Sequence, residues 1–597
     1  MNALVSKVSS TLSPVRNSSI APDISHLVDE QLLHFGIDPG GQFGKQLATL
    51  AEQLYGCQGS IDDLWVLAQQ EIANLEHDDS IALFNAKKFL SFQIAKILDA
   101  FQNGFRRSHQ QLGLSNATNA AHGPYPLVDN VAALFSATPV IARTATYTFA
   151  CADWIADAFE GREFMHPVYS RLLNPTSIAL ANHIVDLECG QLAPEYLAWN
   201  FNSGMAAIDS TLSHLLGHRD IVISSRNVYG GVHQLLNDWY AKPSNLDIAV
   251  EPFDGATVDD FLACWSRVRE NHADRLRDGR QAYLYLESPC NPHGFVLDVP
   301  ELCKTAHQLG IRVVLDATVG TPFLQRPLQA EDPAERPDFL VHSYTKDLSG
   351  TGSVIGGCAI ARNEDMFLPK GQPGWEETMF WNVYYVKGAF LSADSAFEIM
   401  EGMRTLGLRM LSKCINTIIL ARYLDAHPDI QVNCNAVEGH CNAGIREKEL
   451  ALGLPAPLFT FEMRSLDSET FRRFFDNLEP VYSHQISLGQ TNTIISCPGL
   501  TTHSELSLED QRRCGIYPNT VRVSLGCESP GDLVNHFAAV ARHIIDPAKP
   551  GFSAGLMNQG DTVALIRETY MESQKRFIEG ELAEAWRVAP APMVSAA

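Results

Sequence analysis

Between residues 200 and 360 short apolar runs alternate with helical segments, and this alternation constrains the fold more than any other feature of the sequence. Strands joined by helical crossovers form a mostly parallel sheet that is covered on both faces. We therefore predict an α/β fold whose ligand site follows the carboxyl ends of its strands. The predicted strands are IVIS (221–224), LDIAV (246–250), AYLYLE (282–287), IRVVLD (311–316) and FLVHS (339–343).

The segments on either side of this region have different sequence patterns. Residues 24–110 are helical in character, with breaks expected at the glycines of 36–41 and 56–59. After about residue 396, longer helices mix with the strand-like runs LFTFEM and TVRVSL, which predicts a smaller α/β domain. The turn-rich stretch 115–126 is expected to separate the helical extension from the main body, and the last segment, from 546, contains a helix-like stretch.

The clearest helix of the extension, IALFNAKKFLSFQIAKILDAF, carries apolar residues at three- and four-residue spacing. Its lysines make it locally basic, so a membrane-surface helix or a calmodulin-type target is an alternative. Packing against the rest of the protein is the usual use of an apolar stripe, and we adopt that interpretation.

Length and charge exclude several classes of protein. A chain of 597 residues is too long for one core, and a net charge of −24 disfavours nucleic acid and anionic membranes as partners. The 13 cysteines contain no C-x-x-C pair and complete no metal site, which is typical of reduced thiols. Since no long apolar run or signal-type start occurs either, we predict a cytoplasmic protein without membrane spans.

Two strand ends carry the residues from which chemistry is expected. Lys346 follows the strand FLVHS and is flanked by Ser343 and Thr345, so it could form a Schiff base with an aldehyde whose phosphate the hydroxyls bind. Asp316 ends the strand IRVVLD, where a carboxylate needs a cationic partner such as a protonated pyridine nitrogen. The glycines of GTGSVIGG after Lys346 do not form G-x-G-x-x-G, and we interpret them as a close backbone approach near a cofactor.

With these motifs, residues 135–545 resemble the cystathionine γ-synthase and methionine γ-lyase family, the Cys/Met metabolism group of pyridoxal 5'-phosphate (PLP) enzymes. VYSRLLNPT, NSGMAAI, NVYGG, ESPCNP, ISLGQ and TVRVSLGCE occur in the order typical of the family. The resemblance implies PLP fold type I (aspartate aminotransferase-like). It also implies that the cofactor shell comprises Tyr169, Arg171, Ser203, Gly204, Met205, Tyr229, Asn291, Asp316, Thr318, Ser343, Thr345 and Lys346.

The resemblance also implies roles for individual residues. Lys346 would carry the cofactor and act as the base at Cα, Asp316 would keep the ring nitrogen protonated, and Tyr229 would stack on the ring and move protons. Ser487 and Arg522 would bind the substrate, Arg522 by gripping its carboxylate. No metal is expected.

The predicted organisation has five parts: a helical extension (1–120), an arm that by resemblance contributes to the neighbouring active site (121–180), a large PLP-binding domain (181–395), a small C-terminal domain (396–545) and a tail with a helix (546–597). Since Tyr169 and Arg171 would reach across an interface, the active unit would be at least a dimer, and a tetramer is expected.

Departures from the family pattern guide the choice of reaction. Ile486 stands where cystathionine-handling enzymes typically have a glutamate, and an apolar side chain cannot hold a distal ammonium. We therefore expect γ-elimination from an amino acid with a compact leaving group, as in methionine γ-lyases. Three alternatives stay open: a γ-replacement synthase, alkyne formation from a chlorinated unsaturated amino acid, and a regulatory or scaffold protein on a PLP fold.

Overall fold

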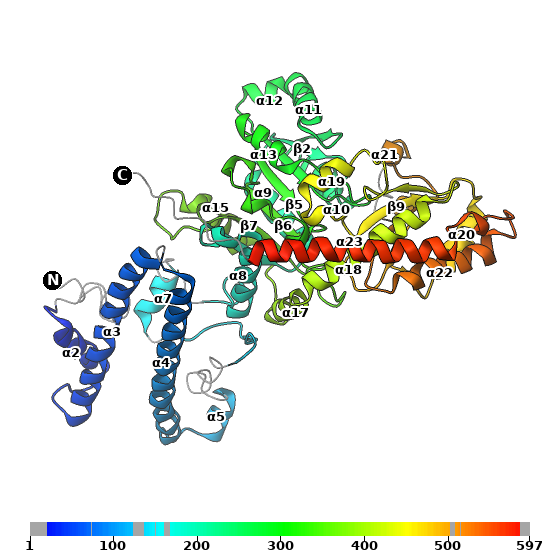
Figure 1. The fold of residues 1–597 in the computed structure, drawn as a ribbon. Coiled ribbons are helices and arrows are strands. Elements are labelled where there is room, and N and C mark those ends of the chain that lie inside the picture. Colours follow the sequence, from blue (N-terminus) through cyan, green and yellow to red (C-terminus); the bar gives the residue numbers. More distant parts are fainter. Residues whose placement is uncertain are drawn as a thin grey trace. The chain divides into compact units, whose positions relative to one another are not determined.

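The computed structural model describes residues 21–72, 75–122, 136–149, 151–159, 168–501, 508–513 and 515–585. The chain divides into two compact units (Figure 1). The first comprises residues 1–140, 146–168 and 587–597, and the second comprises 141–145 and 169–586. In the described residues no helix is both long enough and apolar enough to cross a membrane. The twelve cysteines of the described residues are all free.

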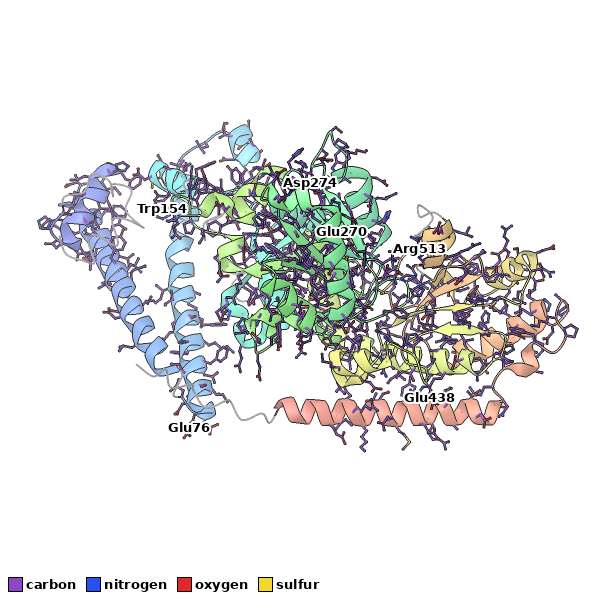
Figure 2. The ribbon with its side chains drawn as sticks, turned by 90° about the horizontal axis from the view of Figure 1, so that it is seen from above. Glu76, Trp154, Glu270, Asp274, Glu438 and Arg513 are labelled. Carbon is purple, nitrogen blue, oxygen red and sulfur yellow. The ribbon has the colours of Figure 1, made fainter. Side chains whose placement is uncertain are left out.

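The secondary-structure elements described for the first unit are helices, as the sequence predicts. Asp23 caps its first helix by accepting the backbone N–H of His26, and Tyr55 of the second helix donates to Gln31 at 2.7 Å. The expected break at 56–59 is wrong, because the second helix runs through both glycines of this stretch. Each glycine costs a helix about 1 kcal/mol, which a long helix tolerates. The expected turn-rich boundary also contains a helical segment, with Ser115 at its start. The helices are α2 (Ile24–His34), α3 (Gln42–Ile72), α4 (His77–Gln111), α5 (Asn116–His122) and α7 (Ala152–Phe159); Glu76 and Trp154 of this unit are labelled in Figure 2.

A seven-stranded sheet organises the large domain of the second unit. Its strand order is β1-β7-β6-β5-β4-β2-β3, and the strands from β6 to β3 run parallel while β7 pairs antiparallel with both neighbours. The mostly parallel sheet predicted from the sequence is therefore confirmed. The strands are β1 (Tyr196–Phe201), β2 (Ile221–Ser225), β3 (Ala249–Phe253), β4 (Ala282–Glu287), β5 (Arg312–Asp316), β6 (Phe339–Ser343) and β7 (Gly357–Arg362).

Three of these strands differ from the sequence prediction. β3 begins three residues later than predicted, because residues 242–247 form a turn in which the Asp247 N–H donates to Lys242 O at 3.1 Å. Pro252 is tolerated in β3 because this strand lies at the edge of the sheet. β1 (YLAWNF) and β7 (GCAIAR) were not predicted from the sequence.

Helices cover this sheet and complete its core. α9 packs on β6, β7 and β1, α13 packs on β5, and α11 packs on β3. The predicted helix before Gly310 is confirmed as α13, and Gly310 follows it with a φ of +72°. The main helices of this domain are α8 (Pro175–Cys189), α9 (Gly204–Leu215), α11 (Val258–Asn271), α13 (Val299–Gln308) and α17 (Ala393–Met403). Short ones are α10 (Gly230–Gln234), α12 (Ala273–Arg277), α14 (Thr321–Leu324), α15 (Asn363–Met366) and α16 (Tyr385–Lys387); Glu270 of α11 and Asp274 of α12 are labelled in Figure 2.

The second sheet has the order β10-β11-β12-β9-β8 and is antiparallel except for the β10–β11 pair. The runs LFTFEM and TVRVSL form its central strands, as predicted. Its strands are β8 (Gln431–Asn433), β9 (Leu458–Glu462), β10 (Ser483–His484), β11 (Ile494–Ser496) and β12 (Thr520–Ser524). Its helices are α18 (Leu406–Asp425), α19 (Ala443–Glu449), α20 (Ser468–Asp476), α21 (Leu508–Arg513) and α22 (Pro530–Val540).

The helix predicted for the tail is α23 (Gln559–Ala585), which lies along α18 (Figure 1). Phe577 of α23 stacks with Phe323 at 6.5 Å between ring centroids, and Arg576 donates to Leu452 O at 3.4 Å. The described part of the tail therefore belongs to the second compact unit. The short 3-10 and π segments are η2 (Gly190–Glu195), η3 (Leu235–Tyr240), η4 (Pro327–Gln329), η5 (Pro333–Glu335), η6 (Trp375–Glu377), η7 (Phe380–Tyr384), η8 (Ala451–Gly453), η9 (Pro498–Leu500), η10 (Ala541–Ile545) and η11 (Ser553–Gly555).

Candidate active site

A cavity of about 180 Å³ opens at the carboxyl ends of β4, β5 and β6, next to the start of α9. This is the edge of a parallel sheet where ligands bind, as the sequence analysis expected. The cavity is lined by Ser203, Gly204, Met205, Ile208, Tyr229, Glu287, Asn291, Asp316, Thr318, Val319, Ser343, Thr345, Lys346 and Leu488. Ten of the twelve residues predicted for the cofactor shell are in that list.

The first turn of α9 has the geometry of an anion site. Ser203 is its extended N-cap and accepts the N–H of Ala206 at 3.1 Å. A Cβ at Gly204 would lie 2.7 Å from the Cβ of Ser343, so only a glycine lets the helix start this close to β6. The unpaired backbone N–H groups of such a helix start, together with the hydroxyls of Ser203 and Ser343, fit a phosphate.

Lys346 is mostly buried, and its Nζ lies 3.2 Å from the Oγ of Ser487. Burial and, to a smaller extent, the nearby Arg522 guanidinium lower the pKa of the Lys346 ammonium to about 8, against the opposing charges of Asp347 and Asp316. A neutral amine is the nucleophilic form of lysine, so this environment suits a lysine that reacts with an aldehyde.

The loop that carries Lys346 is held from behind by α18. Asp347 and Lys413 form an ion pair in which both side chains are almost completely buried. One turn earlier on α18, Arg409 donates to the carbonyl oxygens of Asp347 at 2.8 Å and of Gly402 at 2.9 Å. No local sequence pattern indicates a role for these residues, because only the fold shows that α18 passes behind this loop.

Two buried carboxylates lie side by side in the cavity wall. Glu287 and Asp316 are partners in the register of β4 and β5. Burial raises the pKa of both carboxyls, and the neighbouring Asp316 charge contributes to raising that of Glu287 to about 8. Asp316 accepts the Thr318 N–H at 3.0 Å, and Glu287 accepts backbone N–H groups. A protonated pyridine nitrogen is a cation that would stabilise the charged form of Asp316.

Arg522 enters the site from the small domain and is 2% exposed. Its Nη1 donates to the Oδ1 of Asn291 at 3.1 Å, and its Nη2 donates to the carbonyl oxygen of Ser487 at 2.7 Å. Its Nε is buried and has no hydrogen-bond partner in the described part of the chain. Burial lowers the pKa of this guanidinium to about 10, which leaves it charged at neutral pH and in need of an anion.

Five predicted site residues lie outside the cavity lining, and two of them, Ser487 and Arg522, contact the lining residues Lys346 and Asn291. The Arg171 guanidinium donates to the carbonyl oxygen of Tyr385 and lies 5.8 Å from the centroid of the Tyr169 ring. Ile486 is 73% exposed and lines a different cavity in the small domain. Tyr169 and Arg171 are the residues predicted to act in a neighbouring subunit.

A mostly parallel sheet with a buried lysine, a helix start and an aspartate at its carboxyl edge defines the fold type I class of PLP-dependent enzymes. Residues 128–540 match the family model described as Cys/Met metabolism PLP-dependent enzyme. The chain belongs to this family, as the resemblance predicted, and its cofactor is pyridoxal phosphate.

Individual relatives agree with this assignment. An L-methionine gamma-lyase from Pseudomonas putida is 31% identical over 425 residues, which cover 70% of this chain and 95% of the relative. An O-acetyl-L-homoserine sulfhydrylase from Leptospira meyeri is 28% identical, over 66% of this chain and 89% of the relative. A Campylobacter jejuni structure assigned as an O-acetylhomoserine (thiol)-lyase contains a pyridoxyl-lysine monophosphate. It has a TM-score of 0.58 and 26% identity, over 68% of this chain and 96% of that one. The chain is therefore a PLP-dependent enzyme of γ-elimination or γ-replacement chemistry.

Proposed function

We propose that the enzyme catalyses γ-elimination from an L-amino acid with a compact, uncharged γ-substituent, which departs as a leaving group such as a thiolate, acyloxy or halide. One observation carries the choice of substrate. The two carboxylates among the described lining residues, Glu287 and Asp316, are both buried and both accept backbone N–H groups. Neither is free to hold the distal ammonium of a long diamino acid, and Ile486 cannot do so.

The residues of the cavity fit pyridoxal phosphate. Ser203, Gly204, Ser343 and Thr345 would hold the phosphate, and Asp316 would hold the protonated ring nitrogen. When bound, the cofactor supplies an electron-accepting ring that stabilises negative charge at the amino acid's Cα. Asp316 maintains that capacity by fixing a proton on the ring.

Lys346 and Tyr229 would move the protons. With its pKa lowered to about 8, a larger fraction of Lys346 is the neutral amine near neutral pH than for an exposed lysine, so more of it is able to accept a proton, and the contact with Ser487 orients the Nζ. Tyr229 is 41% exposed at the cavity, where its phenol could donate a proton to the departing group. Arg522 would orient the substrate through its α-carboxylate.

Incubation of the purified full-length enzyme with methionine, O-acetylhomoserine and a γ-halo amino acid tests the reaction. We expect equal amounts of a 2-oxo acid and ammonia from at least one of them, and none from the Lys346→Ala variant. Release of neither product from any substrate would refute γ-elimination. If added cysteine or another thiol is incorporated into the product instead, the enzyme is a γ-replacement synthase.

Two further alternatives have their own tests. Alkyne formation would be detected by mass spectrometry after incubation with a chlorinated unsaturated amino acid, and its support is the resemblance alone. A scaffold or regulatory role would be favoured if the Lys346→Ala protein keeps its biological effect in cells, because that variant lacks the lysine on which catalysis depends.

We also infer that the active sites are shared between two subunits, with Tyr169 and Arg171 reaching the partner's cofactor phosphate, and that the assembly is a tetramer. Mixing inactive Lys346→Ala and Arg171→Ala subunits after mild dissociation tests the sharing, since hybrid dimers would contain one intact site. Recovery of part of the activity is expected, and no recovery would refute sharing. Sedimentation velocity of the full chain and of a chain lacking residues 1–118 gives the assembly size and the contribution of the extension.

A cytoplasmic location is likewise a proposal, supported by the free thiols of the described residues. Fluorescent tagging or cell fractionation of the source cells would test it.

A further inference from the structure

We propose that the small domain carries a second ligand site, separate from the catalytic cavity, which binds an amphipathic anion with an apolar body. The site is a cavity of about 560 Å³. This volume lies within the range of about 300 to 1,000 Å³ that is typical of small-molecule sites.

The cavity is formed by α20, the β10–β11 region, η9 and α21 with the residues that follow it. It shares no lining residue with the catalytic cavity. Its lining comprises Ser468, Phe471, Arg472, Phe475, Asp476, His484, Gln485, Ile486, Ile495, Ser496, Cys497, Gly499, Leu500, Thr501, Gln511, Arg512, Ile516, Pro518 and Asn519.

Apolar side chains in this cavity are left in water. Ile486 and Leu500 are 73% and 72% exposed, although both are large hydrophobic residues. Beside them, the rings of Phe475 and His484 stack at 4.6 Å between centroids, and His484 contacts the carbonyl oxygen of Phe475 at 2.8 Å. The stacked pair gives the cavity a rigid wall, so an apolar body could cover Ile486 and Leu500 without reorganising it.

The polar groups of the cavity favour an anion. Arg472 and Arg512 lie on two different helices, and neither guanidinium forms an ion pair or hydrogen bond in the described part of the chain. Asp476 is the one carboxylate among the lining residues, so the two arginines outnumber it.

A buried hydroxyl adds a second, independent sign of a ligand. Ser496 is 4% exposed and lines the cavity, yet its Oγ has no hydrogen-bond partner among the residues that the structure describes. An unpartnered buried polar atom is costly, and a ligand oxygen would satisfy it. Together with the free arginines, this hydroxyl suits a carboxylate or sulfonate on an alkyl or aryl body.

Calorimetric titration of octanoate into the full-length holoenzyme tests the proposal. We expect one octanoate to bind per chain. The double variant Arg472→Gln, Arg512→Gln should weaken binding by about tenfold or more, because it removes both charged donors. The matched control is Arg473→Gln, Arg513→Gln, which changes the next residue on each helix; Arg513 is labelled in Figure 2 and pairs with Glu509 at 2.7 Å. This control should bind octanoate like the wild type.

Two further measurements sharpen the result. Leu500→Asp places a negative charge on an exposed position of the lining and should abolish octanoate binding while circular dichroism stays unchanged. Octanol should bind more weakly than octanoate and should be insensitive to the arginine changes. No binding of octanoate to the wild type, or equal weakening by both double variants, would overturn the proposal. If the wild type binds no octanoate and the Leu500→Asp protein dissociates in sedimentation velocity, the proposal is also overturned. The surface would then be a contact between copies of the chain.

Discussion

The backbone N–H of Tyr229 donates to the Glu287 carboxylate at 2.6 Å, and the other oxygen of Glu287 accepts the N–H of Asn291 at 2.9 Å. One buried carboxylate thus fixes two loops that both face the cofactor cavity. Since these are backbone contacts, Glu287 positions Tyr229 and Asn291 without needing to touch a ligand itself.

The raised pKa of Glu287 should make the free energy of unfolding fall as the pH rises. Its folded pKa of about 8 lies above the ordinary value of 4.5, so the folded state binds the proton more tightly than the unfolded state. The stabilisation from this proton is complete below about pH 4.5 and is lost as the pH rises to about 8. We expect the wild-type apoenzyme to lose unfolding free energy relative to Glu287→Gln between pH 5 and 8, measured by urea denaturation.

The surface variant Glu270→Gln on α11 is the control for that comparison (Figure 2). It should follow the wild type across the same pH range. A constant difference between wild type and Glu287→Gln at every pH would show that Glu287 titrates normally.

Lys346 should react with the cofactor at a lower pH than an ordinary lysine. Because its neutral form predominates above a pKa of about 8, the rate at which pyridoxal phosphate loads the apoenzyme should rise with pH and level off above that value. An exposed lysine would level off near pH 10.4. Stopped-flow absorbance after mixing apoenzyme with cofactor gives the profile.

Arg522 is one cause of that lowered pKa, so its removal should move the profile. In Arg522→Gln the plateau should appear at a higher pH, because a neighbouring positive charge has been lost. The same variant should lower kcat/KM for amino-acid substrates by about a hundredfold, through loss of the charged contact to the α-carboxylate. Exposed Arg464→Gln is the control, and an unmoved loading profile would contradict the assigned electrostatic role.

Much of this site could be predicted from the sequence because its residues stand directly after strand ends. Asp316 ends β5, and Lys346 follows β6 by three residues. The contribution of the small domain to the site was harder to predict from the sequence. Ile486 is next to Ser487 in the chain, yet its side chain lines the small-domain cavity and not the catalytic cavity. Closeness in the sequence does not indicate the face to which a side chain turns. The contact of α18 with the Lys346 loop also joins residues 66 positions apart, without a local pattern.

Ile486 can affect substrate selectivity if assembly of the oligomer brings its side chain to the entrance of the catalytic cavity. Ile486→Glu should then raise kcat/KM for cystathionine relative to methionine, because the new carboxylate can pair with the distal ammonium. The two kcat/KM values are measured side by side on one preparation, with Ile486→Gln as the uncharged control. An unchanged ratio would assign Ile486 to the second cavity alone.

The ion pair of Asp347 and Lys413 should be costly to break and much less costly to replace. Both side chains are almost fully buried, so Lys413→Met leaves an unpaired carboxylate beside Lys346, and we expect a loss of about 3–5 kcal/mol of unfolding free energy. The double variant Asp347→Asn, Lys413→Met removes both charges and should recover most of that loss. Urea denaturation of the apoenzyme measures both.

Cofactor loading separates a structural role of this pair from an effect on Lys346. The Asp347 charge raises the pKa of Lys346, so the single variant Asp347→Asn should move the loading plateau to a lower pH, opposite to the shift in Arg522→Gln. In Lys413→Met the plateau should move upward, because the unneutralised Asp347 acts more strongly on the lysine. A plateau that stays in place in both single variants would mean that the pair holds the loop mechanically and leaves the charge state of Lys346 to Arg522, Asp316 and burial.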